Sequence, residues 1–269
     1  MRRLLTILLF GLFAEHGLAQ QDSSFVLVRS IEAPIADAAM DNFGNLYIIS
    51  PSGQIKKLND SGDSVAVYNQ VNKFGKLYSI DVSNPLKVLL FYKDFSTVVV
   101  LDRFLSNLAT MNLRKYNILQ PGAVALSYDN NVWVYDEYDN KLKKIDEQGN
   151  HLLETSDFRT VFNRSILPQK IINDNGLVYL ADSANGVFIF DNYGSFKKKL
   201  DVKNWQSIAI ASNNLISTNN EIISVYNTST LMQTQRKWPY FKPYYRSFTS
   251  ADKFVHFSNS RLQVYRYRF

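Results

Sequence analysis

Four acidic residues are the first candidates for chemistry in this 269-residue chain. Asp136, Glu137 and Asp139 lie almost side by side in the sequence, and Asp182 follows a similar apolar run further on. Carboxylates on converging turns can bind Ca²⁺, which takes about six to eight oxygen ligands. A corresponding stretch, Ser258-Asn259-Ser260, contributes no carboxylate. We therefore interpret the four acids as solvated turn residues and predict neither a metal site nor a cofactor.

Nucleophilic chemistry has less support in the sequence. After the N-terminal region the chain contains two histidines, His151 and His256, which are far apart, and it contains no cysteine. No glycine-rich phosphate-binding motif is present. A Ser-His-Asp triad or a His-rich metal site is therefore not expected, and no catalytic residue is predicted. We interpret both histidines as surface or strand residues.

A run of aromatic and cationic residues near the C-terminus is the most unusual local feature. Residues 238–246 read Trp-Pro-Tyr-Phe-Lys-Pro-Tyr-Tyr-Arg. Aromatic rings and cations are favoured at recognition surfaces, and proline lowers the entropy cost of presenting them. The predicted partner-binding residues are Trp238, Tyr240, Phe241, Lys242, Tyr244, Tyr245 and Arg246. The alternative is that these aromatics pack between neighbouring structural units. The long connection from Asp157 to Pro168 would add to the same face.

The net charge of +6 and the pI near 9.2 are ordinary for a soluble surface. Lys197-Lys198-Lys199 lies in a predicted outer strand, where lysine protects an exposed edge. We predict no nucleic-acid partner.

The first 20 residues are typical of a secretory signal peptide, and residues 21–269 form the predicted folded domain. Arg2 and Arg3 precede the apolar stretch from Leu4 to Ala14, and Gly17-Leu18-Ala19 provides a small-residue cleavage site. The apolar stretch is shorter than the ~20 residues of a membrane span. The absence of cysteine excludes a lipoprotein anchor and fits a bacterial envelope better than a eukaryotic extracellular space. We expect an exported, periplasmic or secreted protein that does not span the membrane.

Two series of polar residues recur at nearly constant intervals and predict the elements that position these candidates. The first series precedes a β-rich run and consists of Asp41, Asn84, Asp129, Asp174, Asn213 and Asp252. The second series ends the next β-rich run and consists of Asn59, Asp102, Asp146, Asp191 and Asn227. Asp and Asn bond to their own backbone at turns, so these residues need no further function. Short strands repeating every ~42 residues predict a β-propeller.

The repeat predicts an all-β fold of six four-stranded antiparallel blades. The last blade has three strands of its own, at Ser247–Thr249, Lys253–Phe257 and Leu262–Tyr267. The strand Phe25–Arg29 can complete it and close the ring, which removes an exposed edge. The alternating aromatics from Tyr265 to Phe269 would also suit an outer-membrane barrel, but such a barrel needs strands of about ten residues.

Blades 1, 3 and 4 resemble the NHL-type repeat. Blade 4 carries the closest match, in the run from Asp174 to Asp182 followed by Gly186 to Gly194. The resemblance implies a six-bladed propeller like the secreted propeller proteins of Bacteroidota. It scarcely implies a function, because propellers perform many unrelated tasks.

These observations favour a non-enzymatic adaptor of the bacterial cell envelope, accessory to outer-membrane assembly or secretion machinery. We expect it to be monomeric alone and to bind a protein partner. Two alternatives are a Ca²⁺-dependent hydrolase or lactonase with an acidic channel site, and a carbohydrate-binding propeller that uses its aromatics.

Overall fold

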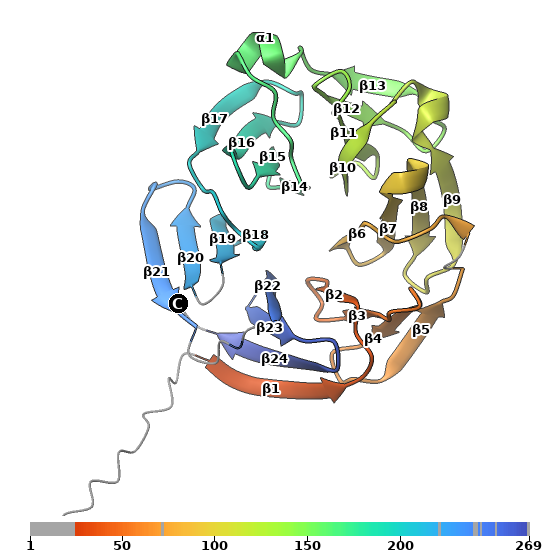
Figure 1. Cartoon of the computed structure of the whole chain (residues 1–269), viewed down its shortest axis with the longest axis vertical. Coiled ribbons are helices and arrows are strands. Elements are labelled where there is room, and N and C mark those ends of the chain that lie inside the picture. The colour runs from red at the N-terminus through yellow and green to blue at the C-terminus, as the bar shows by residue number, and fades with distance from the viewer. Residues whose placement is uncertain are drawn as a thin grey trace, which may run out of the picture.

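Six four-stranded antiparallel sheets are arranged in a ring around a central axis, like the blades of a propeller (Figure 1). This computed structural model describes residues 25–267, apart from 71–72, 220–221, 239–241, 243 and 251. The predicted fold is confirmed in blade number, strand number and strand direction. The predicted signal peptide lies outside the described residues, and within them no helix is both long and apolar enough to cross a membrane.

Each blade runs outward from an inner strand at the centre of the ring to an outer strand at its rim. Blade 1 contains β2 (Asp37–Met40), β3 (Leu46–Ile49), β4 (Ile55–Leu58) and β5 (Ser64–Tyr68). Blade 2 contains β6 (Ser79–Asn84), β7 (Lys87–Tyr92), β8 (Thr97–Asp102) and β9 (Asn107–Asn112). Blade 3 contains β10 (Pro121–Leu126), β11 (Val132–Asp136), β12 (Lys141–Ile145) and β13 (His151–Glu154). Blade 4 contains β14 (Lys170–Asp174), β15 (Leu177–Asp182), β16 (Gly186–Asp191) and β17 (Phe196–Leu200). Blade 5 contains β18 (Ser207–Ala211), β19 (Asn214–Asn219), β20 (Ile222–Asn227) and β21 (Gln233–Lys237).

Blade 6 joins the two ends of the described chain. It contains β22 (Arg246–Ser250), β23 (Lys253–Phe257) and β24 (Arg261–Tyr267), and its outer strand is β1 (Phe25–Glu32). β1 pairs with β24 from Phe25 opposite Tyr267 to Glu32 opposite Arg261. The predicted ring closure is therefore confirmed, and β1 is longer than the predicted strand.

The repeated Asp and Asn residues build the turns between strands. In blade 2, Asp102 Oδ1 accepts the backbone N–H groups of Phe104 and Ser106, each at 2.8 Å. Asp146 and Asp191 accept backbone N–H groups two and four residues further on in the same way. These bonds satisfy turn donors that no strand partner can reach, which explains the recurrence of the residue type.

The apolar core is divided among the spaces between blades, because each sheet buries both of its faces against its neighbours. Two short 3₁₀ helices, η2 (Lys93–Phe95) and η3 (Leu113–Tyr116), flank β8 and β9. One short helix, α1 (Phe158–Phe162), lies in the long connection between blades 3 and 4. Its Phe162 ring packs against Phe188 at 5.0 Å and Phe196 at 4.9 Å between centroids.

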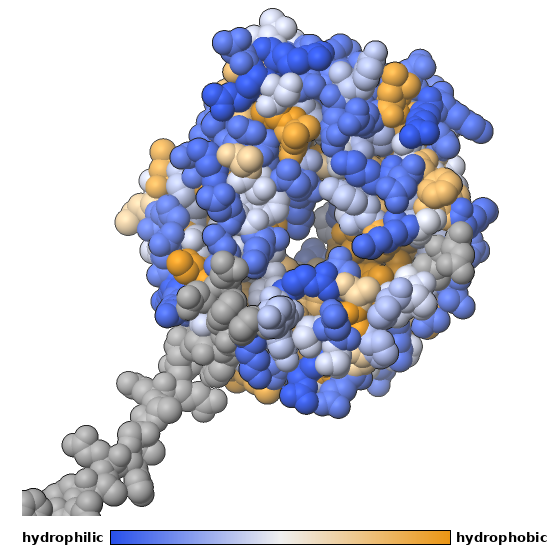
Figure 2. Space-filling view, viewed as in Figure 1, coloured by the Kyte–Doolittle hydropathy of each residue, from blue (hydrophilic) through white to orange (hydrophobic). Residues whose placement is uncertain are grey.

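The two faces of the ring differ in their loops. We call the side that carries the connections between blades, and the turns between second and third strands, the connection face. The opposite face carries the remaining turns. Figure 2 shows the central opening and a largely polar surface on which apolar side chains form separate patches.

Candidate functional site

The predicted partner-binding residues lie where blade 5 passes into blade 6, and the structure separates them into a buried part and an exposed part. Trp238 is 2% exposed and packs among Phe25, Phe254 and Tyr265. Its ring fills the space between the two blades, which is the packing alternative considered above. Tyr240 and Phe241 lie outside the described residues.

Tyr244 is the most exposed large side chain of this connection. Its side chain is 98% exposed and its backbone φ is +72°. A bulky residue rarely adopts this left-handed conformation, which costs about 1–3 kcal/mol. Tyr244 therefore combines a strained backbone conformation with a ring that is displayed on the connection face.

The residue after Tyr244 is anchored on the blade below. The Tyr245 ring stacks on the His256 imidazole with 4.5 Å between centroids, and its backbone N–H donates to the Lys242 carbonyl at 3.2 Å. His256 is buried on β23, and its Nδ1 lies 2.8 Å from Ser247 Oγ. Burial, helped by the positive charge of Lys242, lowers the pKa of His256 to about 4. His256 is therefore neutral at physiological pH.

Arg246 fixes the other end of this segment across the ring closure. Its guanidinium donates to the Ala36 carbonyl, lies 3.6 Å from the Asp37 carboxylate and covers the Phe257 ring at 4.6 Å from the centroid. Half of each charged side chain is open to solvent, so the ion pair itself contributes little stability. Together the three contacts fix the position of Arg246 against blade 1 and against Phe257 of its own blade. We call Lys242, Tyr244, Tyr245 and Arg246 the 244 loop.

The inner strands carry further charged side chains, and these include both acids and cations. Lys170 donates to the Ile208 carbonyl of the next blade at 2.9 Å, and Asp81 accepts the Leu126 N–H at 2.8 Å. Desolvation within the ring raises the pKa of Asp37 and lowers the pKa of Lys170. These contacts link neighbouring blades, and the mixture of acids and cations favours neither a cation nor an anion.

The acidic candidates of blades 3 and 4 are committed to structural bonds. Asp182 accepts the N–H groups of Leu167, Ala184 and Asn185 at 2.8–2.9 Å. It thereby connects the turn after β15 to the chain that enters β14. Within the described residues, no group of three metal-binding side chains is found.

Asp136 is also committed, and its partner is a buried lysine. Asp136 accepts the N–H groups of Leu119, Gln120 and Tyr138, and Lys143 Nζ lies 2.9 Å from its Oδ2. Lys143 is 2% exposed and also bonds to Asp139. Burial disfavours the lysine charge, but the bonds to the two carboxylates outweigh it and raise the pKa of Lys143.

The histidines do not assemble a nucleophilic site among the residues described. His256 and Ser247 are paired, but His256 Nε2 is buried and has no hydrogen-bond partner in the described part of the chain. A triad needs an acid at that nitrogen to orient the ring. His151 is exposed, and its Nε2 lies 2.6 Å from the Tyr116 carbonyl oxygen.

Sequence reasoning missed Asp37 and Lys170, which join neighbouring blades, and the Ser247–His256 pair, which joins two strands of blade 6. No local signal could reveal them, because each partner lies in another strand or another blade. The left-handed conformation of Tyr244 was also missed, although the neighbouring prolines indicate an irregular backbone.

No family model matches this sequence, and no curated protein matches it. Solved propeller structures do match the fold. The WD40 domain of Neurospora crassa Pan2 is 10% identical, with a TM-score of 0.63 over 93% of this chain and 97% of that domain. A catalytically inactive virginiamycin B lyase from Staphylococcus aureus, solved with quinupristin, is 11% identical, with a TM-score of 0.60 over 91% and 100%.

A third similar structure is PorZ of Porphyromonas gingivalis, described as an essential bacterial surface component of the type-IX secretion system. It is 13% identical, with a TM-score of 0.56 over 87% of this chain and 32% of PorZ. At these identities the likeness shows the propeller fold alone.

Proposed function

We propose that this chain is a non-enzymatic adaptor of the bacterial cell envelope that binds a protein partner through the connection face. The 244 loop is the centre of the proposed surface. The observation that carries the proposal is Tyr244, whose ring is almost fully exposed while its backbone adopts the left-handed conformation that bulky residues rarely take. Tyrosine is favoured at the centre of interfaces, because its ring gives a large contact area and few of its bonds become ordered on binding.

The neighbours of Tyr244 support the same reading. Tyr245 and Arg246 are held by contacts to blades 6 and 1, so these two side chains lose little conformational freedom when a partner binds. Lys242 adds an exposed cation next to the tyrosines, with its Nζ 5.8 Å from the Tyr245 ring centroid. This surface would suit a partner segment that combines an apolar pocket for Tyr244 with acidic groups.

The proposed setting is the periplasm or the cell surface, next to outer-membrane assembly or secretion machinery. Two observations support it: the signal-like segment of residues 1–20 and the fold shared with PorZ. We further propose that the protein is monomeric alone. The NHL-like character of blades 1, 3 and 4 stays a prediction.

A quantitative pull-down from envelope extracts of the native host tests the proposal. Tyr244→Ala should reduce the capture of one defined protein at least about tenfold, as expected for a central interface tyrosine. Tyr193→Ala is the matched control, because Tyr193 is 80% exposed in a turn of blade 4 on the opposite face. Equal capture by the parent protein and Tyr244→Ala would reject the proposed surface.

A further inference from the structure

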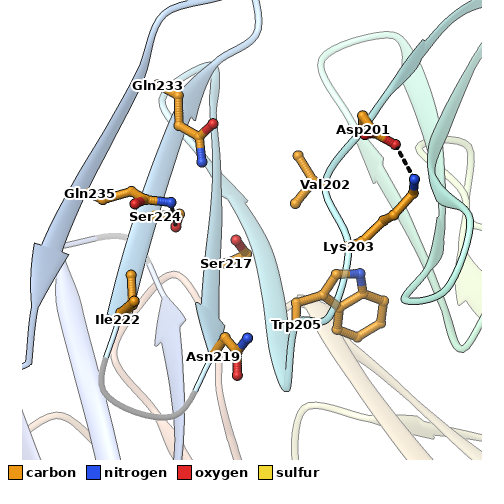
Figure 3. A pocket seen from close by; sticks show the side chains of 10 residues that line it. All are labelled: Asp201, Val202, Lys203, Trp205, Ser217, Asn219, Ile222, Ser224, Gln233 and Gln235. Carbon is orange, nitrogen blue, oxygen red and sulfur yellow. Dashed lines mark hydrogen bonds and ion pairs between the residues drawn. The ribbon is translucent and has the colours of Figure 1, made fainter.

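A polar hollow of about 160 Å³ lies between blades 4 and 5 (Figure 3). Its walls are three strands of blade 5 and the connection that leaves blade 4. The lining residues that carry the argument are Lys203, Trp205, Ser217, Asn219, Gln233 and Gln235. None of them belongs to the segment that carries the proposed function.

The hollow exists because blade 5 has small residues where other blades have large ones. Ser217 on β19 lies opposite Ser224 on β20. The equivalent cross-strand pair in blade 4 is Leu180 and Phe188, both buried against blade 3. Replacing two large apolar side chains by hydroxymethyl groups removes volume from the space between blades. The two serines of blade 5 thus account for the hollow, and they give it a polar lining.

Several hydrogen-bonding groups of this lining are uncommitted. Within the described part of the chain, the side chains of Ser217, Asn219 and Gln233 form no hydrogen bond. Ser217 is buried, whereas Asn219 and Gln233 are exposed. Their hydroxyl and amide groups are therefore available to a ligand in the hollow, which would not have to break a hydrogen bond within the described residues.

The charge of the lining indicates what kind of partner fits. Its only charged groups among the described residues are Asp201 and Lys203, which pair with each other at 2.6 Å at the solvent-exposed rim. The remaining polar lining consists of amides and hydroxyls, which can both donate and accept. Such a site has no unpaired charge that would bind an anion or a cation. It suits an uncharged ligand with several hydroxyl groups.

We propose that this hollow binds a neutral sugar ring, either free or at the end of a glycan. Trp205 supplies an apolar wall for the C–H face of the ring, while Ser217, Asn219 and Gln233 bond to its hydroxyls. The volume is below the roughly 300 Å³ of sites for larger ligands, which limits the occupant to about one ring.

Intrinsic fluorescence offers a direct assay, because Trp133 and Trp238 are fully buried whereas Trp205 is only partly buried. The full chain without its predicted signal peptide would be titrated with D-glucose, D-galactose, D-mannose and N-acetyl-D-glucosamine, and applied in parallel to an array of neutral glycans. At least one sugar should bind and change the fluorescence. Binding on the array alone would assign the glycan end as the ligand. If no sugar and no glycan binds, the proposal is wrong.

Filling the hollow with the residues of blade 4 gives the matched test. The double substitution Ser217→Leu with Ser224→Phe should weaken sugar binding, measured by calorimetry, at least about tenfold. Gln233→Ala, at an exposed site, should weaken it in the same direction without a risk to folding. Thr234→Ala, on the other face of β21, should change it less than about twofold.

Sugar binding that survives both the filled variant and Gln233→Ala would overturn the assignment of the site. These outcomes are independent of the proposed function, since the Tyr244→Ala pull-down does not involve this hollow. Loss of sugar binding with intact partner capture, or the reverse, would separate the two proposals.

Discussion

The Tyr245 ring lies on the His256 imidazole, with 4.5 Å between centroids and 18° between the planes. This stack joins an inter-blade connection to a middle strand of blade 6. Because His256 is 2% exposed and also contacts Ser247, it gives Tyr245 a buried anchor, and the neighbouring Tyr244 is exposed to solvent. An anchored Tyr245 beside an exposed Tyr244 is the arrangement expected of a preformed binding surface.

Burial of His256 predicts a pH dependence of stability. Its pKa is lowered to about 4 in the folded protein, against an ordinary value near 6.5. Between these values the unfolded chain binds a proton that the folded chain does not. The stabilisation is therefore complete above about pH 6.5 and is lost as the pH falls toward 4, by about 3 kcal/mol. Imidazole NMR titration should give a midpoint near 4 for His256.

The variant His256→Gln supplies the control for this effect, because it keeps a polar side chain without the titration. Its free energy of unfolding should fall less between pH 7 and pH 4 than that of the parent protein. A His256 midpoint near 6.5, or the same pH dependence in both proteins, would contradict the buried position.

The buried Lys143–Asp136 pair predicts a large loss of stability on removing one partner. Lys143→Met would leave the Asp136 carboxylate buried without its cation, although three backbone N–H donors remain. We expect the free energy of unfolding to fall by about 3 kcal/mol in urea denaturation. Lys141→Met is the control: its ion pair with Glu154 is partly exposed and should contribute at most about 1 kcal/mol. Similar losses for both variants would count against the burial of Lys143.

Trp238 is predicted to contribute to stability through packing. Trp238→Ala should lower the free energy of unfolding by about 4 kcal/mol, because it leaves a cavity between blades 5 and 6. Trp238→Phe should cost less, since much of the ring volume is kept. Urea denaturation measures both, and an unchanged stability for Trp238→Ala would place this side chain at the surface.

The bonding of the acidic turns predicts the response to calcium. Asp136 and Asp182 already accept several N–H donors, so their oxygens are occupied. Millimolar Ca²⁺ should therefore leave the melting temperature unchanged. A reproducible rise, which ligand binding to the folded state would cause, would revive the hydrolase or lactonase alternative.

The repeated turns made the architecture predictable from the sequence. Residues such as Asp102 and Asp191 form local bonds to their own turns, so their spacing reports the blade register directly. The strand Phe25–Glu32 could be assigned to blade 6 because the last repeat is one strand short.

Other features depend on contacts between residues that are far apart in the chain, and these contacts could not be predicted from the sequence. The outer strand of blade 5, Gln233–Lys237, was missed because all five residues are polar and exposed, and neighbouring strands alone determine its conformation. The burial of Trp238 and the exposure of Tyr244 could not be separated, because both belong to one aromatic run. The hollow beside Trp205 arises from a serine pair whose significance is visible only beside the equivalent pair of blade 4.

The most direct test of the proposed adaptor surface is site-specific photocrosslinking in the envelope of the native host. A photoreactive phenylalanine would replace Tyr244 in one strain and Tyr193, on the opposite face, in another. We predict one dominant protein adduct at position 244, absent at position 193 and competed by excess purified parent protein. No adduct at position 244, or the same adducts at both positions, would contradict the proposal.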